Sequence, residues 1–246
     1  MVDERKQNNF SDLFDNLSAS LVSFWESQTI YAGVKLGIFE NINQEGTFLE
    51  ELSDSIEIEY ANLLKIIRGL SSLDLLKVKN NRVFITQKGE FLQNDSEFSL
   101  ASAAIMWNEE HYETWKKTFH ALKSGKEEFS SLFNAPYFEW LEDSDKKAEL
   151  YQRAISTYAK KDYHKVPIIQ DFSRHKVVLD VGGGSGYLLR NLLEIYPNLK
   201  GVLLESEITI KIAKTEVLKD FTDRCEFVIG NFFERIPKGA DAIFLC

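Results

Sequence analysis

The chain has 246 residues, 44% of them hydrophobic and 13% aromatic, with a formal net charge of −9. These totals predict one large or two modest globular domains and exclude a disordered chain. The acidic balance argues against general affinity for nucleic acid or anionic membrane, because both require clustered Lys and Arg.

Cysteine content and the amino-terminal segment predict the compartment. Cys225 and Cys246 are the two cysteines, and they provide no disulfide framework. The start MVDERKQNNFSDLF is polar rather than a signal peptide, and no apolar stretch reaches the roughly 18 residues of a membrane span. We therefore expect a cytoplasmic protein without a membrane partner.

The first 100 residues predict helices and one hairpin. An apolar stripe from Leu21 to Val34 ends at Gly37, a short helix is expected over 47–52, and residues 59–73 have one apolar face. Apolar residues then flank the turn Lys79–Arg82, which indicates a hairpin. Helix, short helix, longer helix and hairpin is the order of a winged helix.

A winged helix suggests DNA binding, but residues 1–100 contain nine Lys and Arg against sixteen Asp and Glu. This charge makes DNA reading the weakest interpretation. The segment has more apolar residues than so small a unit can bury alone, which favours packing against another subunit. We therefore predict that residues 1–100 form a winged-helix-like dimerisation domain.

Residues 101–175 predict a helical connector, with helices over 101–106, 109–122 and 138–159. Aromatic residues are concentrated here, and helix packing accounts for most of them. A few are expected to line an apolar pocket for a planar substrate.

From residue 176 the pattern alternates between strands and helices. Such alternation indicates a parallel sheet covered by helices, and hence an α/β domain over 176–246. The predicted strands are 177–181, 201–204, 225–229 and 241–245, and the predicted helices are 187–195 and 208–217.

A glycine-rich turn follows the first strand of this domain and reads Asp180-x-Gly182-x-Gly184-x-Gly186. Its spacing fails the dinucleotide fingerprint and lacks the Gly-Lys-Ser/Thr ending of a P-loop. Bare glycines let a ligand lie on the backbone, and the acid offers a negative charge to a cationic group. S-adenosylmethionine has such a group, and Glu205, which ends the second strand, can accept hydrogen bonds from ribose hydroxyls.

Motifs along nearly the whole chain resemble the small-molecule O-methyltransferases, the class that includes plant caffeate-type and bacterial polyketide-tailoring enzymes. In the carboxy-terminal part they are LDVGGGSGYLL, GVLLES, DRCEFVIGNFFERIP and GADAIFL. In the amino-terminal part they are AGVKLGIFE, LLKIIRGLSSLDLL, FITQKGEFL, EEHYETWKKTFHALKSGKEEF and FNAPYFEWL. The resemblance implies an intertwined homodimer and a Rossmann-like domain that binds S-adenosylmethionine.

The resemblance also assigns the cofactor residues. Gly182, Gly184 and Gly186 would line the methionine end with Asp180 beneath, and Glu205 would bind the ribose. Two more residues, Asn231 and Phe232, would lie at the adenine. Asn231 stands where the family usually has an acid, so weaker cofactor binding is expected.

Acceptor-binding residues follow from the same resemblance. His111 matches a position near the substrate pocket, and Ile155 lies where relatives often have a methionine. Trp107 and Phe138 are predicted to face the same pocket, which suits a flat apolar molecule bearing a hydroxyl. No metal site is predicted.

The family's sheet has seven strands, and this chain stops at the fourth. The family's general base, a histidine in a His-Asp-Trp stretch, is expected beyond Cys246. None of the chain's own residues is therefore predicted to be catalytic, and the sheet is expected to be incomplete after the fourth strand. The alternative is a non-catalytic protein that binds S-adenosylmethionine or only dimerises.

Overall fold

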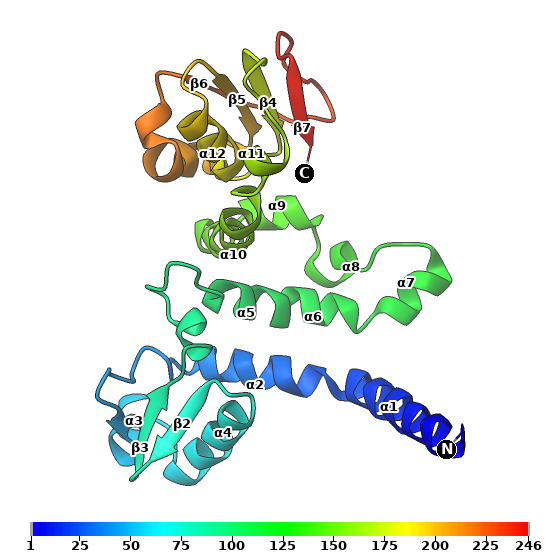
Figure 1. Ribbon diagram of the computed structural model, residues 1–246, viewed down its shortest axis with the longest axis vertical. Coiled ribbons are helices and arrows are strands. Elements are labelled where there is room, and N and C mark those ends of the chain that lie inside the picture. Colours follow the sequence, from blue (N-terminus) through cyan, green and yellow to red (C-terminus); the bar gives the residue numbers. More distant parts are fainter. Residues whose placement is uncertain (1, 246) are drawn as a thin grey trace. The chain divides into compact units, whose positions relative to one another are not determined.

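The computed structural model describes residues 2–245, and side chains from residue 10 onwards. The chain divides into two compact units, residues 1–124 and 125–246 (Figure 1). The expected three-part division at residues 100 and 175 stays a prediction.

The first unit is mostly helical and contains one small sheet. The helix pattern predicted over 59–73 is confirmed as a helix over Tyr60–Ser72. Its elements are α1 (Val2–Val22), α2 (Phe24–Lys35), β1 (Thr47–Phe48), α3 (Leu49–Ser55), α4 (Tyr60–Ser72), β2 (Leu76–Lys79), β3 (Arg82–Ile85), η1 (Gly89–Leu92), α5 (Ala101–Asn108), α6 (Glu110–Trp115) and α7 (Thr118–Ser124).

The small sheet is antiparallel, in the order β1-β3-β2. Asn80 and Asn81 have φ values of +51° and +60°, as a tight hairpin turn between β2 and β3 requires, which confirms the predicted hairpin. The short helix expected over 47–52 is partly wrong, because Thr47 pairs with Val83 as strand β1 and the helix begins only at Leu49. The pairing partner is distant in the sequence, so no local pattern indicates the strand.

Helix α1 was not predicted as an element, although its apolar residues recur at helical spacing. Each of these side chains is between 63% and 72% exposed. They form an apolar stripe on α1, made of Phe10, Leu13, Phe14, Leu17 and Leu21. This spacing is a local signal for a helix and is readable from the sequence.

The second unit is an α/β domain preceded by helices. Strands predicted over 177–181 and 225–229 and the helix predicted over 187–195 are confirmed. Its elements are α8 (Phe129–Phe133), α9 (Tyr137–Glu142), α10 (Asp145–Tyr163), α11 (Val166–Ile169), β4 (Val177–Val181), α12 (Tyr187–Ile195), β5 (Lys200–Glu205), α13 (Glu207–Ile212), η2 (Ala213–Val217), η3 (Lys219–Phe221), β6 (Cys225–Ile229) and β7 (Ala242–Leu245).

The sheet of the second unit is parallel throughout, in the order β6-β5-β4-β7 (Figure 1). The chain runs outward from β4 to β6 and then returns across β4 to β7. In open α/β sheets, ligands bind at the carboxyl ends of the strands, next to such a reversal of strand order.

One face of the sheet carries the main core of this unit. Val178, Leu203 and Cys225 point to that face and pack with Leu188 and Leu192 of α12. On the other face, a smaller cluster of Leu179, Val181 and Leu204 is buried. The two clusters therefore bury both faces of β4 and β5.

Two predicted helices are interrupted. The helix expected over 138–159 is two helices, because Ser144 adopts an extended conformation (φ −154°, ψ 117°) between α9 and α10. The helix expected over 109–122 divides into α6 and α7. Apolar periodicity continues across such a break, so a linear pattern does not reveal it.

Within residues 2–245, none of the helices combines the length and hydropathy that a bilayer crossing requires.

Candidate cofactor site

The glycine turn joins the carboxyl end of β4 to the start of α12. Gly182, Gly184 and Gly186 have φ values of +66°, +57° and +89°, a region that side chains with a Cβ rarely adopt. The backbone N–H of Gly182 donates to the carbonyl of Leu204 at 2.9 Å, which fixes the turn against the end of β5. The sequence therefore needs glycine here for the bend itself.

The glycines differ in what a side chain would meet. A Cβ at Gly183 would lie 2.2 Å from the carboxyl carbon of Asp180, and one at Gly186 would lie 2.5 Å from Leu218. A Cβ at Gly184 would have no heavy atom within 4 Å. Packing thus accounts for Gly183 and Gly186, whereas Gly184 leaves its backbone open to a ligand.

Asp180 lies beneath this turn and is 1% exposed. Neither of its carboxylate oxygens has a hydrogen-bond partner among the described residues. Burial, and then the charge of Glu205, raise the pKa of Asp180 to about 7. A buried acid without a partner is suited to an incoming cation, which would compensate the charge that the fold leaves unpaired.

The raised pKa of Asp180 predicts how stability depends on pH. Between pH 4 and 7 the folded state holds a proton that the unfolded state has lost, so stability falls as pH rises. A shift of this size corresponds to roughly 4 kcal/mol across the window. Chemical denaturation at several pH values should show this decline in the ligand-free protein and a much flatter curve in Asp180→Asn.

A matched control is Asp223→Asn, which removes a carboxylate far from the turn in the sequence and should leave the decline in place. Parallel curves for wild type and Asp180→Asn would contradict the assignment.

Glu205 ends β5 beside the turn. Its carboxylate accepts a hydrogen bond from the N–H of Gly184 at 3.3 Å and one from the N–H of Ser206 at 2.6 Å. It thereby connects the glycine turn to the turn that follows β5. Each carboxylate oxygen can accept more than one hydrogen bond, so capacity for ligand hydroxyls remains.

Phe232 and Asn231 follow β6. The Phe232 ring lies 3.5 Å from the position of a Cβ on Gly182, so it borders the turn. Asn231 accepts a hydrogen bond from the N–H of Phe233 at 3.0 Å through its side-chain oxygen. The structure thus brings Phe232 to the turn, while Asn231 organises its own loop.

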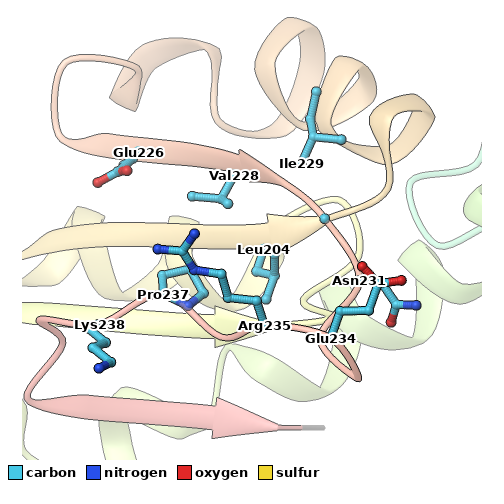
Figure 2. Close-up of a pocket in the computed structure, with 10 residues that line it drawn as sticks. Leu204, Glu226, Val228, Ile229, Asn231, Glu234, Arg235, Pro237 and Lys238 are labelled. Carbon is cyan, nitrogen blue, oxygen red and sulfur yellow. The ribbon is translucent and has the colours of Figure 1, made fainter.

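A cavity of about 430 Å³ lies over Leu204 and Val228, on the sheet face away from the main core. Figure 2 shows the segment from Asn231 to Lys238 passing along it. Of the predicted cofactor residues, Asn231 lines this cavity, whereas the glycine turn and Glu205 do not. The cavity is therefore distinct from the space over Gly184.

The match to a known family covers the whole of the second unit and the end of the first. The O-methyltransferase domain family matches residues 115–246, more than half of the chain. The chain belongs to the O-methyltransferase family. This match confirms the resemblance found in the sequence. The family uses S-adenosylmethionine as its methyl donor.

Two curated relatives show how far the O-methyltransferase likeness extends. The phenazine O-methyltransferase PhzM of Lysobacter antibioticus is 28% identical over 92% of this chain and 67% of its own length. The mitomycin biosynthesis 6-O-methyltransferase of Streptomyces lavendulae is also 28% identical, over 90% of this chain and 64% of its own. The chain spans about two thirds of the length of these relatives.

Two solved structures share the O-methyltransferase architecture. LaPhzM superposes with a TM-score of 0.87 at 27% identity, covering 94% of this chain and 70% of that one. Human N-acetylserotonin methyltransferase, solved in complex with SAM, superposes with a TM-score of 0.82 at 20% identity, covering 94% of this chain and 69% of that one. The α/β class is thereby confirmed.

The predicted acceptor residues of this O-methyltransferase lie in both units. In the first unit, Trp107 of α5 and His111 of α6 are in contact, with ring centroids 4.7 Å apart. In the second, Phe138 of α9 is 67% exposed and Ile155 of α10 is half-buried. A single pocket formed by all four stays a prediction.

Three further histidines lie outside the glycine turn and the strand ends beside it. His120 is in α7 of the first unit, and His164 caps the carboxyl end of α10. His175 precedes β4 at the amino edge of the sheet, where its Nδ1 lies 3.6 Å from Oδ1 of Asp241. The turn is at the opposite edge, so His175 is a poor candidate for a base there.

Sequence reasoning missed the polar residues that support the candidate site. Ser206 caps α13 by accepting a hydrogen bond from the N–H of Thr209, a Ser-x-x-Thr pattern that could have been noticed. Ser156 and Gln152 of α10 contact the site's turns, and no local signal indicates this. No group of metal-ligating side chains occurs in the part of the chain that the structure describes.

Proposed function

We propose that this chain binds S-adenosylmethionine on its glycine turn and belongs to an enzyme that methylates a hydroxyl of an aromatic or polyketide-like small molecule. The observation that carries the proposal is the buried, unpartnered carboxylate of Asp180 beneath the glycine turn, together with the open backbone of Gly184 in that turn. Family membership supports the same chemistry.

In this proposal each site residue has a distinct role. Asp180 supplies a negative charge toward the ligand's ammonium group, Gly184 allows contact with the backbone, and Glu205 accepts hydrogen bonds from the ribose hydroxyls. Phe232 borders the turn and would flank the adenine. Asn231 retains a carbonyl lone pair and an amide for the adenine edge.

S-adenosylmethionine supplies a methyl group on a sulfonium, and the protein's task is to orient the acceptor oxygen in line with it. Placement of this kind provides much of the rate, and a general base adds roughly 10²–10⁴-fold for a phenol. His175 lies at the edge of the sheet opposite the glycine turn, which supports the expectation that it does not act as that base.

The acceptor is proposed to be flat and apolar with a hydroxyl group. Trp107, Phe138 and Ile155 offer aromatic and aliphatic surface, and His111 offers a hydrogen bond to the acceptor. The names of the phenazine and mitomycin biosynthesis enzymes above support O-methylation of a small molecule.

We also propose that the first unit contains a winged-helix-like dimerisation domain that forms a homodimer. The apolar stripe on α1 supports this, because five large side chains in a row on one helix face are more than half exposed. A second copy of the chain would remove them from water.

Calorimetric titration with S-adenosylhomocysteine, at pH 5.5 and at pH 7.5, tests the proposal. Binding of the ligand's cation requires ionised Asp180, so affinity should rise on the order of tenfold between these pH values. Asp180→Asn should bind more weakly and lose this pH dependence, whereas Asp223→Asn should retain it.

The outcomes separate the alternatives. Absence of binding heat at millimolar ligand would refute the proposed cofactor site. Methylation of a phenolic acceptor by this chain would refute the non-catalytic alternative.

A further inference from the structure

Helix α10 contacts the glycine turn through a hydroxyl pair. The oxygens of Ser156 and Ser185 lie 2.7 Å apart. Ser185 stands between Gly184 and Gly186 and is only 3% exposed. Its side chain is therefore held inside the protein, and Ser156 is its hydrogen-bond partner across 29 residues of sequence.

One helical turn earlier, α10 contacts the first turn of α13, the helix that begins just after β5. Gln152 donates through its side-chain nitrogen to the hydroxyl of Thr209 at 2.8 Å, and Thr209 is 1% exposed. The Thr209 hydroxyl lies 2.9 Å from that of Ser206, whose N–H donates to Glu205. A continuous set of hydrogen bonds thus leads from α10 to the carboxylate of Glu205.

The contacts of Ser156 and Gln152 support the two segments that Glu205 connects. Glu205 already joins the two turns through the N–H groups of Gly184 and Ser206. Gln152 and Ser156 are four residues apart and therefore share one face of α10, which meets both turns at once. Helix α10 packs against α12 of the same unit, and Ala154 within α10 is fully buried.

We infer that Gln152 and Ser156 are positioning residues for the cofactor site. They hold the glycine turn and Glu205 at the separation that an adenosyl ligand must span. This inference rests on the proposed function for its ligand. The geometry that it describes is present in the ligand-free chain and can be measured without one.

Hydrogen exchange on the ligand-free full chain is the first measurement. In Ser156→Ala and Gln152→Leu, exchange of amides in 182–186 and 205–209 should rise about fivefold, the value of one net hydrogen bond. The strands β4 and β6 should keep wild-type protection. Ser156→Thr keeps the hydroxyl and should restore protection of the glycine turn.

Arg153→Ala is the matched control, because this exposed guanidinium donates to the carboxylate of Glu149 within α10 itself. It should leave exchange in both turns unchanged. Unchanged exchange in Ser156→Ala and Gln152→Leu, or a uniform rise throughout the second unit, would overturn the inference.

Calorimetry with S-adenosylhomocysteine is the second measurement. Ser156→Ala and Gln152→Leu should each lose about fivefold in affinity, and the double variant should lose more. The thermal midpoint of unfolding should change little in Ser156→Thr. Faster exchange in the turns together with no ligand binding by wild type would refute the proposed function but support the positioning role. Wild-type affinity in both variants would refute the positioning role alone.

Discussion

Replacing Gly184 with asparagine is expected to weaken S-adenosylhomocysteine binding by on the order of 100-fold or more. Asparagine tolerates the left-handed backbone that this position requires, at φ +57°. Its side chain would project into the space where no protein atom lies within 4 Å of a Cβ. The loss should therefore come from blocked access to the backbone, and calorimetric titration measures it.

The chain offers a matched control in Gly125→Asn. Gly125 also has a left-handed backbone, at φ +66°, and a Cβ there would likewise meet no atom within 4 Å. The two variants should therefore have similar stability, and only Gly184→Asn should lose the ligand. Equal affinities in both variants would place the ligand elsewhere.

Replacing Leu17 with glutamate should dissociate the proposed homodimer. Leu17 lies in the middle of the apolar stripe on α1 and is 65% exposed. Burial of one leucine side chain contributes roughly 1.5–3 kcal/mol, and a symmetric interface contains the residue twice. The dimer dissociation constant should rise on the order of 10²–10⁴-fold, which sedimentation velocity over a concentration series can measure.

Ala19→Glu is the matched control, because it adds the same charge at an exposed position on the opposite side of α1. Two residues along a helix turn the side chain away from the stripe. This variant should leave the association unchanged. A dimer that persists in Leu17→Glu would show that the stripe is not the interface. Dissociation of both variants would point to a general effect of charge on α1.

Much of the second unit could be predicted because its signals are local. Residues 177–181 and 225–229 are short apolar runs, and Tyr187–Ile195 has an apolar helix face closed by Pro197. The positive φ values of Gly182, Gly184 and Gly186 follow from the residue type at the turn. Strand ends then place Asp180 and Glu205 at the same edge of a parallel sheet.

The state of these site residues was not predictable in the same way. The raised pKa of Asp180 depends on the depth of the core around it and on the charge of Glu205. The distinction between Gly184, which is open, and Gly186, which packs against Leu218, depends on a residue that lies far along the chain. Neither property is written in the spacing of the motif.

Elements whose partners are distant were missed or misjudged. Thr47 belongs to a strand because it pairs with Val83. Gln152 of α10 donates a hydrogen bond to Thr209, which lies 57 residues further along the sequence. Propensity and periodicity act over a few residues, so they indicate which segments are strands or helices and which bend needs glycine. Hydrogen bonds and burial between segments tens of residues apart arise only when the chain is folded, and they determine which side chains meet at the site.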